Sequence, residues 1–388
     1  MRITAIDLFT YEAPFLYGYH SAHLLRLRAD SLIIALRCEG GLTGFGESIP
    51  RPYVTGESPA SVKILFETTF TDLLIGQEVE TIADVERLLE KLKQACRKRE
   101  ITEFQSALGA VDISLLDALG KHQCIPVYRY LGPELRRSIP WSLVIPLLPE
   151  AVIRKFSDES VRKTFSSLKV LMGRDELQNQ KRLKLVRKLF GDEIGIRVEV
   201  NGYWTREEAK SNLKKLIEFG ITAVEQPVAK GDIEGLREIR QTFGIPVIVD
   251  ESMCGPEDAE ELITRGACDI LNIKISKVGG LLSARRIASL AASRGVSCLL
   301  GCHVGETGIL TNAAFHFLVT APNLLLVEGF SSFLFGEVSK IDDLDLENLI
   351  SEIFTTQGLG FDPEATILRE RDPEEITIPR SHETVLLR

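Results

Sequence analysis

Three short β-branched runs, each ending at a carboxylate, constrain this chain more than any other feature. The runs end at Glu199, Glu225 and Asp250, and a helical pattern follows each of them at a nearly even interval. Parallel strands joined by crossover helices bring their carboxyl ends to the same edge of a sheet, so these three acids should converge. Converging carboxylates repel one another unless a cation lies between them, and ligands that are all oxygen suit Mg²⁺, with Mn²⁺ as the alternative. The sequence therefore predicts a metal site at the C-terminal mouth of a barrel.

The alternation of strand, loop and helix extends well beyond these three acids, through residues 133–335. We expect eight strands there, at residues 140–144, 167–171, 196–201, 223–226, 246–250, 270–275, 297–302 and 324–328. Eight evenly spaced units favour a closed parallel barrel. An open doubly wound sheet is the alternative, but no Gly-rich phosphate fingerprint follows the first strand, which favours the barrel.

The first 132 residues have a different pattern, which predicts a separate α+β domain. Alternating residues up to about position 50 predict a three-stranded antiparallel meander, and helical patterns follow to about position 130, with a buried helix at 104–119. We expect two irregular loops rich in aromatic residues, at 15–23 and 50–57. Such loops serve either as binding surface or as ordinary connections. Residues 336–388 are expected to fold back onto this first domain.

Bulk composition excludes several classes of protein. A length of 388 residues suits about two domains, and a formal net charge of −9 argues against a nucleic-acid partner. No apolar run reaches the roughly 18 residues that a membrane span needs, and the start lacks the apolar core of a signal peptide. Seven scattered cysteines without CxxC spacing suggest reduced thiols. We therefore expect a cytoplasmic protein.

Two lysines interrupt apolar strands close to the acidic strand ends. Lys169 and Lys274 each lie in a run that is otherwise apolar, so their amines should point into the barrel or toward its mouth. There, burial and a nearby cation would hold either amine close to neutrality, as a proton-abstracting base requires. The alternative for each is a structural ion pair with an acidic strand end.

Several motifs, in this order and spacing, resemble the enolase superfamily, close to its muconate-lactonizing group of dipeptide epimerases and o-succinylbenzoate synthases. The motifs are Gly-Phe-Gly-Glu at 44–47, the acids on three successive strands, Lys-Ile-Ser-Lys-Val-Gly-Gly at 274–280, and Gly-Leu-Gly at 358–360. The resemblance implies an α/β protein in which an N-terminal α+β capping domain (1–132) closes over a (β/α)₇β TIM-like barrel (133–335). It also implies that Mg²⁺ binds a substrate carboxylate while a lysine removes the proton on the adjacent carbon.

The sequence departs from this family pattern at two positions. The family has Lys-x-Lys on the second barrel strand; Lys169 matches the first lysine, but Leu171 replaces the second. The family's Asp-x-Asn on the third strand is here Glu199 followed by Asn201, and the longer glutamate still reaches a metal. Because epimerisation by two bases needs an acid on each face of the α-carbon, Leu171 favours a lyase, dehydratase or cycloisomerase. A racemase or epimerase of amino acids or dipeptides, and a non-catalytic metal-binding homologue, are the alternatives.

The predicted site combines these residues with others at the strand ends and in the two loops. Lys274, Lys169 and His303 are the expected catalytic groups, and Glu199, Glu225 and Asp250 the expected metal ligands. His303 either protonates a leaving group or shapes the mouth. Glu328 either contacts a substrate ammonium or hydroxyl or forms a salt bridge at the rim. The expected partner is a small-molecule carboxylate, in a homo-oligomer. The expected substrate-binding residues are Tyr17, His20, Tyr53, Asn201, Glu251, Glu306 and Glu328.

Overall fold

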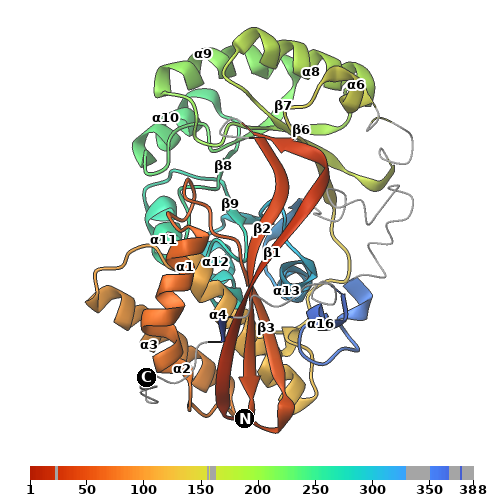
Figure 1. Ribbon diagram of the computed structural model, residues 1–388. Helices are drawn as coiled ribbons and strands as arrows, with labels where there is room; N and C mark the ends of the chain where they lie inside the picture. Colours follow the sequence, from red (N-terminus) through yellow and green to blue (C-terminus); the bar gives the residue numbers. More distant parts are fainter. Residues whose placement is uncertain (22–24, 155–156, 158–162, 329–349, 367–375, 378–388) are drawn as a thin grey trace, which may run out of the picture.

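The computed structural model describes residues 1–21, 25–154, 157, 163–328, 350–366 and 376–377. An antiparallel sheet with its helices forms one part of the molecule, and a closed parallel barrel ringed by helices forms the other (Figure 1). The predicted fold class is therefore confirmed. Among the described residues, no helix is both long enough and apolar enough to cross a membrane.

The antiparallel sheet is the predicted meander with one strand added from the far end of the chain. Its order is β12-β1-β2-β3, in which β1 spans Ile3–His20, β2 Leu25–Cys38, β3 Thr43–Ser48 and β12 Ile376–Thr377. The two-residue β12 pairs with β1 through Asp7 and Leu8. A segment close to the C-terminus thus completes the sheet that the N-terminus begins.

The prediction of an irregular loop at 15–23 is wrong for its described residues. β1 continues to His20 and pairs with β2, so this stretch is one arm of a long hairpin that reaches up from the sheet (Figure 1). The pairing register shifts between Pro14 and Tyr19, because proline has no N–H to donate to the ladder and interrupts the alternation. Because of this irregularity, the segment lacks the strict two-residue alternation that identifies a strand in a sequence. Residues 22–24 lie outside the described part.

The helices of the first domain pack against this sheet. They are α1 Pro59–Leu65, α2 Thr71–Leu74, α3 Ile82–Lys98, α4 Gln105–Gln123 and α5 Tyr128–Leu131, with a π-helical turn at Phe66–Phe70. The central helix α4 is buried along almost its whole length, as predicted. Gly44 and Gly46 of β3 allow its close approach, because a Cβ at these positions would lie 2.1 Å from Ser114 O and 1.9 Å from Ala110 O.

The barrel closes in the order β10-β11-β4-β5-β6-β7-β8-β9. Each strand pairs in parallel with its neighbours, and helices fill the connections on the outside (Figure 1). The strands are β4 Trp141–Ile145, β5 Ser167–Leu171, β6 Gly195–Glu199, β7 Ile221–Glu225, β8 Val247–Val249, β9 Ile270–Ile273, β10 Ser297–Leu300 and β11 Leu324–Glu328. The helices are α6 Glu150–Ile153, α8 Glu176–Phe190, α9 Arg206–Leu216, α10 Ile233–Phe243, α11 Pro256–Thr264, α12 Leu281–Ser293 and α13 Gly308–Leu318.

The inside of the barrel is apolar at its base and charged toward its mouth. Ala223, Ile248 and Leu299 form a small buried cluster of their own, separate from the main core that lies between strands and helices. Because successive side chains of a strand point to opposite faces, residues two positions further along also face inward. At Glu225 and Asp250 these positions are acidic, so the strand ends place charge at the mouth.

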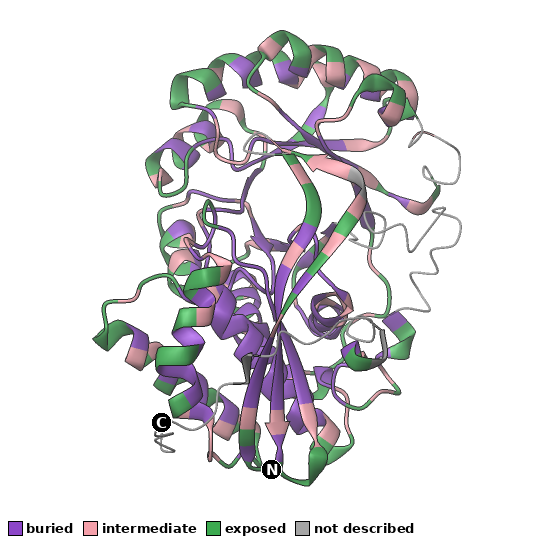
Figure 2. Cartoon of the chain, in the orientation of Figure 1, coloured by how far each residue is buried: buried purple, intermediate pink, exposed green. Residues whose placement is uncertain are grey.

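The first domain lies over this charged mouth and is bonded to it. Ile49 N donates to Ser276 Oγ at 3.1 Å, and Thr307 N donates to Glu47 Oε1 at 3.1 Å. The contact region is largely buried, whereas the far arms of the hairpin are partly exposed (Figure 2).

The described part of the C-terminal segment packs on the first domain. Leu359 N donates to Asp117 Oδ1 of α4 at 2.8 Å, and Gly358 forms a bridge with Pro126. The short helix α16 Pro363–Thr366 follows. The proposed boundary between residues 335 and 336 lies outside the described residues, so the domain limits stay a prediction.

A candidate metal and proton-transfer site at the barrel mouth

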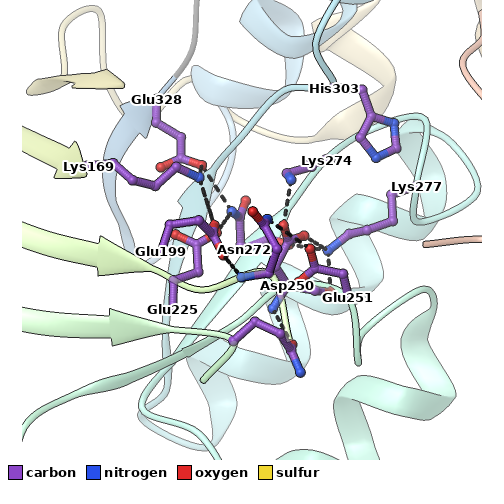
Figure 3. Close-up of polar contacts among 12 residues, drawn as sticks. Lys169, Glu199, Glu225, Asp250, Glu251, Asn272, Lys274, Lys277, His303 and Glu328 are labelled. Atoms are coloured by element: carbon purple, nitrogen blue, oxygen red, sulfur yellow. Dashed lines mark hydrogen bonds and ion pairs between the residues drawn. The ribbon is translucent and has the colours of Figure 1, made fainter. Parts of the chain in front are cut away.

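The three acidic strand ends meet inside the barrel mouth. Glu199 ends β6, Glu225 ends β7 and Asp250 follows β8, and one carboxylate oxygen from each lies within 4.8 Å of the others. All three are buried, and Figure 3 shows them with the residues that surround them. The donor set is entirely oxygen, which suits a hard divalent cation such as Mg²⁺. These residues therefore fit the metal that the sequence predicts.

Lys169 of β5 extends into the middle of this group of acids. Its Nζ lies 2.7 Å from Glu328, 3.1 Å from Glu199 and 3.3 Å from Glu225 (Figure 3). A buried ammonium is stable only when carboxylates surround it, and here three of them do. Lys169 therefore neutralises the acid cluster from the side of β5.

Two further lysines share Asp250 from the opposite side. Lys274, which follows β9, lies 2.5 Å from Asp250 Oδ2. Lys277 donates to Asp250 Oδ1 at 2.7 Å, to Asp250 O at 2.7 Å and to Asn272 O at 2.8 Å. Lys277 is completely buried. Lys277 therefore supports Asp250 from inside the barrel.

The charges of these groups shift one another's pKa values. Burial alone would lower the pKa of Lys169 and of Lys274, but the neighbouring carboxylates raise both well above the ordinary value. Burial alone would raise the pKa of Asp250, but Lys274 and Lys277 hold it well below its usual range. Burial alone therefore does not hold the two amines near neutrality, and the expectation that burial and a nearby cation together do so stays a prediction.

Two inward-facing residues that we did not predict complete the network below the mouth. Arg197 of β6 forms an ion pair with Glu328 and donates to Ser142 Oγ at 3.0 Å. Asn272 of β9 donates to Glu225 Oε1 at 2.6 Å and to Glu328 Oε1 at 3.1 Å. Both are polar residues in apolar strands, the same signal that identified the lysines, so the sequence did contain the clue.

Glu328 is engaged by the protein itself. Its carboxylate contacts Lys169 as well as Arg197 and Asn272. Burial by itself would raise the pKa of Glu328, but the positive charges of Lys169 and Arg197 lower it to about 2. This arrangement corresponds to the salt-bridge alternative, inside the barrel and not at its rim. Glu328 is therefore poorly placed to receive a substrate ammonium.

Asn201 and Glu251 flank the acid cluster. Asn201 N donates to Glu199 Oε1 at 2.7 Å, and Asn201 Nδ2 donates to Glu251 Oε1 at 3.2 Å. Burial, reinforced by the charge of Asp250, raises the pKa of Glu251 to about 7. Both residues adjoin the acid cluster, and their predicted contact with substrate stays a prediction.

The segment after β10 brings His303 and Glu306 to the mouth. His303 is buried, and among the described residues neither of its ring nitrogens has a hydrogen-bond partner. Burial, together with the positive charges of Lys274 and Arg51, lowers the pKa of His303 well below its ordinary value. Glu306 accepts a hydrogen bond from His303 N at 2.5 Å, and burial raises its pKa to about 8. Glu306 thus helps to shape the segment that presents the imidazole.

The hairpin of the first domain contributes Tyr19, which we did not predict. Its phenol is close enough for the charges of Lys169, Glu199 and Lys274 to act on it, and burial raises its pKa. Tyr19 therefore lies over the mouth. Strand alternation at 17 and 19 is the signal that would have found it, had the stretch been read as a strand.

Three other residues of the first domain, Tyr17, His20 and Tyr53, were predicted to contact the substrate. His20 is exposed, and its carbonyl accepts a hydrogen bond from Leu147 N at 2.9 Å, which ties the hairpin to the loop after β4. Tyr53 is 36% exposed, in the turn after β3. Tyr17 lies in β1, but its side chain is outside the described part of the structure. The contact of these three with substrate stays a prediction.

Leu171 lies across the mouth from Lys274. It is buried, two residues after Lys169 on the same face of β5, and pairs in register with Glu199. Strands β5 and β9 are separated by three strands in either direction around the barrel. The mouth therefore has an amine on the β9 side and, at the facing strand end, an aliphatic side chain.

Comparison with known proteins places the chain in a family. The model described as "Enolase C-terminal domain-like" matches residues 152–367, and that of the mandelate racemase / muconate lactonizing enzyme N-terminal domain matches residues 7–132. The hydrophobic dipeptide epimerase of Enterococcus faecalis is 30% identical over 86% of this chain and 91% of its own. Muconate cycloisomerase 1 of Rhodococcus opacus is 27% identical over 93% of this chain and 95% of its own.

A solved structure agrees with these matches. The dipeptide epimerase from Enterococcus faecalis complexed with Mg and the dipeptide L-Leu-L-Tyr has a TM-score of 0.75 and 28% identity, covering 84% of this chain and 90% of its own. The structure of that relative contains Mg. The present chain has a similar fold and brings three buried acids together in it. The chain therefore belongs to the enolase superfamily, in its muconate-lactonizing-enzyme-like group.

Proposed function

We propose that this protein is a Mg²⁺-dependent enzyme that removes the proton next to a substrate carboxylate, with Lys274 as the base, and that it catalyses an elimination or cycloisomerisation. The observation that supports this proposal is the asymmetry of the mouth: Lys274 faces Leu171 across the barrel. Two other amines lie near the acids, but three carboxylates hold Lys169, and Lys277 is completely buried and bonded to Asp250 and two backbone carbonyls. Lys274 contacts one carboxylate.

Glu199, Glu225 and Asp250 would hold the metal. When bound, Mg²⁺ would supply positive charge to neutralise the negative charge that develops on the substrate carboxylate. Lys169, which already lies among these acids, would add a second positive charge on the same side. The substrate carboxylate is thus oriented by one wall of the mouth, and its α-carbon is directed toward Lys274.

The remaining chemistry belongs to Lys274. Positive charge from an ion bound at the three acids would offset the carboxylates that raise the pKa of Lys274, and would so favour its neutral amine. That amine would take the α-proton, and the electron pair of the broken C–H bond would move toward the substrate carboxylate. In an elimination the bond from the β-carbon to the leaving group then breaks, and the ammonium of Lys274 returns its proton to the leaving group. Both proton transfers occur on one face because Leu171 has no proton to exchange on the other.

A dipeptide or amino-acid epimerase is the second candidate. The 30% identical relative is named as a hydrophobic dipeptide epimerase, which favours this reaction as strongly as Leu171 opposes it. Epimerisation here would require a proton donor on the side of Leu171, such as a water molecule. The engagement of Glu328 by Lys169 and Arg197 argues against recognition of a free substrate ammonium at that strand end.

Solvent isotope exchange tests the proposal and separates the candidates. Wild type and Lys274→Ala are incubated with Mg²⁺ in D₂O with both enantiomers of dipeptides, N-acyl amino acids and hydroxy acids, and NMR follows the α-proton. We expect loss of the α-proton signal without inversion in wild type, and a fall of about 10²–10⁴ in rate in Lys274→Ala. Lys210→Ala, at a surface ion pair, is the control.

The outcomes distinguish three possible functions of this protein. Inversion from both enantiomers in wild type would identify an epimerase, whereas inversion only after Leu171→Lys would show that this position had blocked it. Equal ligand affinity in wild type and Lys274→Ala, with exchange in neither, would favour a non-catalytic binding protein and refute the proposal.

A further inference from the structure

We propose that His303 contacts the substrate directly and recognises an anionic oxygen distant from the metal-bound carboxylate. This inference rests on the proposed function, because it takes the barrel mouth to be the substrate site, and it adds a residue that selects the substrate. The proton abstraction described above does not use His303.

The first argument is that the imidazole is buried and unsatisfied. His303 is 4% exposed, yet among the described residues neither Nδ1 nor Nε2 has a hydrogen-bond partner. Leaving a buried polar group unpaired destabilises a protein, so such groups are rare unless a ligand or water completes them. The other histidine that is buried in the described part of the chain is a useful contrast: His316 accepts a hydrogen bond from Tyr128 N at 3.2 Å, and its Nε2 lies 3.2 Å from Leu359 O. His303 is therefore not an ordinary core histidine.

The second argument is its location beside the reacting side of the mouth. His303 follows β10, the neighbour of β9, and in Figure 3 its ring points toward Lys274 and Lys277. It thus lies on the side of the proposed base and not on the side of Leu171. A substrate bound with its α-carbon near Lys274 would bring its more distant atoms past this ring.

The third argument is the charge around the ring. The charged groups that act most strongly on His303 are three cations, Lys274, Arg51 and Lys277, and one anion, Asp250. Both lysines are paired with Asp250, and Arg51 is paired with Asp30, so these five groups together carry one net positive charge. A neutral imidazole beside these groups donates one N–H, and an anionic oxygen is the acceptor that the surrounding charge favours.

The first domain holds the segment that presents this ring. Arg51 is buried and donates to Val304 O at 2.9 Å. Glu47 accepts from Thr307 Oγ1 at 2.7 Å and from Thr307 N at 3.1 Å. Together with the bond from His303 N to Glu306, these contacts fix the backbone on both sides of the ring. A fixed backbone with an unbonded ring is the arrangement expected of a preorganised ligand contact.

A pair of matched ligand series tests the inference. Calorimetry with Mg²⁺ measures Kd for dicarboxylates of three to six carbons and for the monocarboxylates of the same length, in wild type, His303→Ala, His303→Gln and the exposed control His122→Ala. For at least one length, wild type and His122→Ala should bind the dicarboxylate about ten-fold tighter than its monocarboxylate, the value expected for one hydrogen bond to a charged group. His303→Ala should lose this preference, and His303→Gln should regain part of it.

The possible results separate this inference from the proposed function. The monocarboxylates should bind wild type and His303→Ala equally, since they do not reach the ring. If wild type shows no preference for dicarboxylates, or if His303→Ala keeps it, the inference is overturned while carboxylate binding stands. If no carboxylate of either series binds with Mg²⁺, the inference fails, and the isotope-exchange experiment decides the proposed function separately. Because no described group bonds the ring, its removal breaks no hydrogen bond of the protein, and melting curves of all the His303 variants check that they are folded.

Discussion

Lys277 provides a stability test that needs no knowledge of the substrate. Its ammonium is completely buried and makes an ion pair with Asp250 together with hydrogen bonds to two backbone carbonyls. Lys277→Met keeps most of the side-chain volume but removes the charge and all three donors. Asp250 keeps Lys274 as its remaining cation, and the carbonyls of Asp250 and Asn272 lose a donor.

The expected loss follows from these contacts. Removing one partner of a buried ion pair costs about 3–5 kcal/mol, because the other charge stays buried. At about 2–4 °C per kcal/mol for a unit of the size of this barrel, the melting temperature should fall by on the order of 10 °C. Lys210→Met is the matched control: it removes a partly exposed lysine that pairs with Glu238 at 2.6 Å, and ion pairs at the surface contribute little to stability.

Comparing the loss in melting temperature with and without Mg²⁺ ties this test to the candidate metal site. If Asp250 binds Mg²⁺, the ion supplies positive charge in place of Lys277, so the loss in melting temperature should be smaller with Mg²⁺ than with a chelator. The control should lose the same small amount in both conditions. Calorimetric melting of wild type and both variants, with and without Mg²⁺, measures these differences. A loss below about 1 kcal/mol, or a large loss that Mg²⁺ leaves unchanged, would refute the reasoning.

Two further predictions concern a close approach and a titration. Gly301→Ala should weaken Mg²⁺ binding as measured by calorimetry. The new Cβ would lie 2.3 Å from Asn272 Oδ1 and would displace the amide that donates to Glu225. Gly195→Ala is the control and should leave the affinity for Mg²⁺ unchanged, because its Cβ would have no neighbour nearer than 3.7 Å. His316 should make stability fall as pH falls from 6.5 to about 4, since burial lowers its pKa to about 4 while the unfolded chain already binds a proton below 6.5. The contribution is on the order of 3 kcal/mol over this window. Urea unfolding should therefore show a shallower pH dependence for His316→Gln than for wild type, and equal slopes would contradict the assignment.

Much of the fold could be read from local patterns. The eight barrel strands lie close to the predicted ranges, and β5 and β11 coincide with them. Buried parallel strands are short β-branched runs bounded by helices, which is a strong local signal. The long hairpin was missed because Pro14 and the register shift beside it break the alternation that identifies a strand.

In the candidate site, too, local sequence patterns predict some features and not others. The positions of Glu199, Glu225 and Asp250 at successive strand ends indicate convergence, because parallel strands share a direction. The pairing of Lys169 with Glu328, from strands far apart in the chain, does not follow from any local pattern. Such pairs depend on which strands become neighbours or face one another across the closed barrel.

By itself, then, the sequence determined the barrel, the domain that caps it and the converging acids, since strand period, spacing and residue type are local properties. Only the tertiary structure decided how the buried charges are shared: Lys277 supports Asp250 from within, Glu328 is taken up by Lys169 and Arg197, and His303 keeps both ring nitrogens unbonded by any described group. The physical reason is that the energy of a buried charge or polar group depends on the distance and orientation of partners from several strands, which exist only once the barrel has closed.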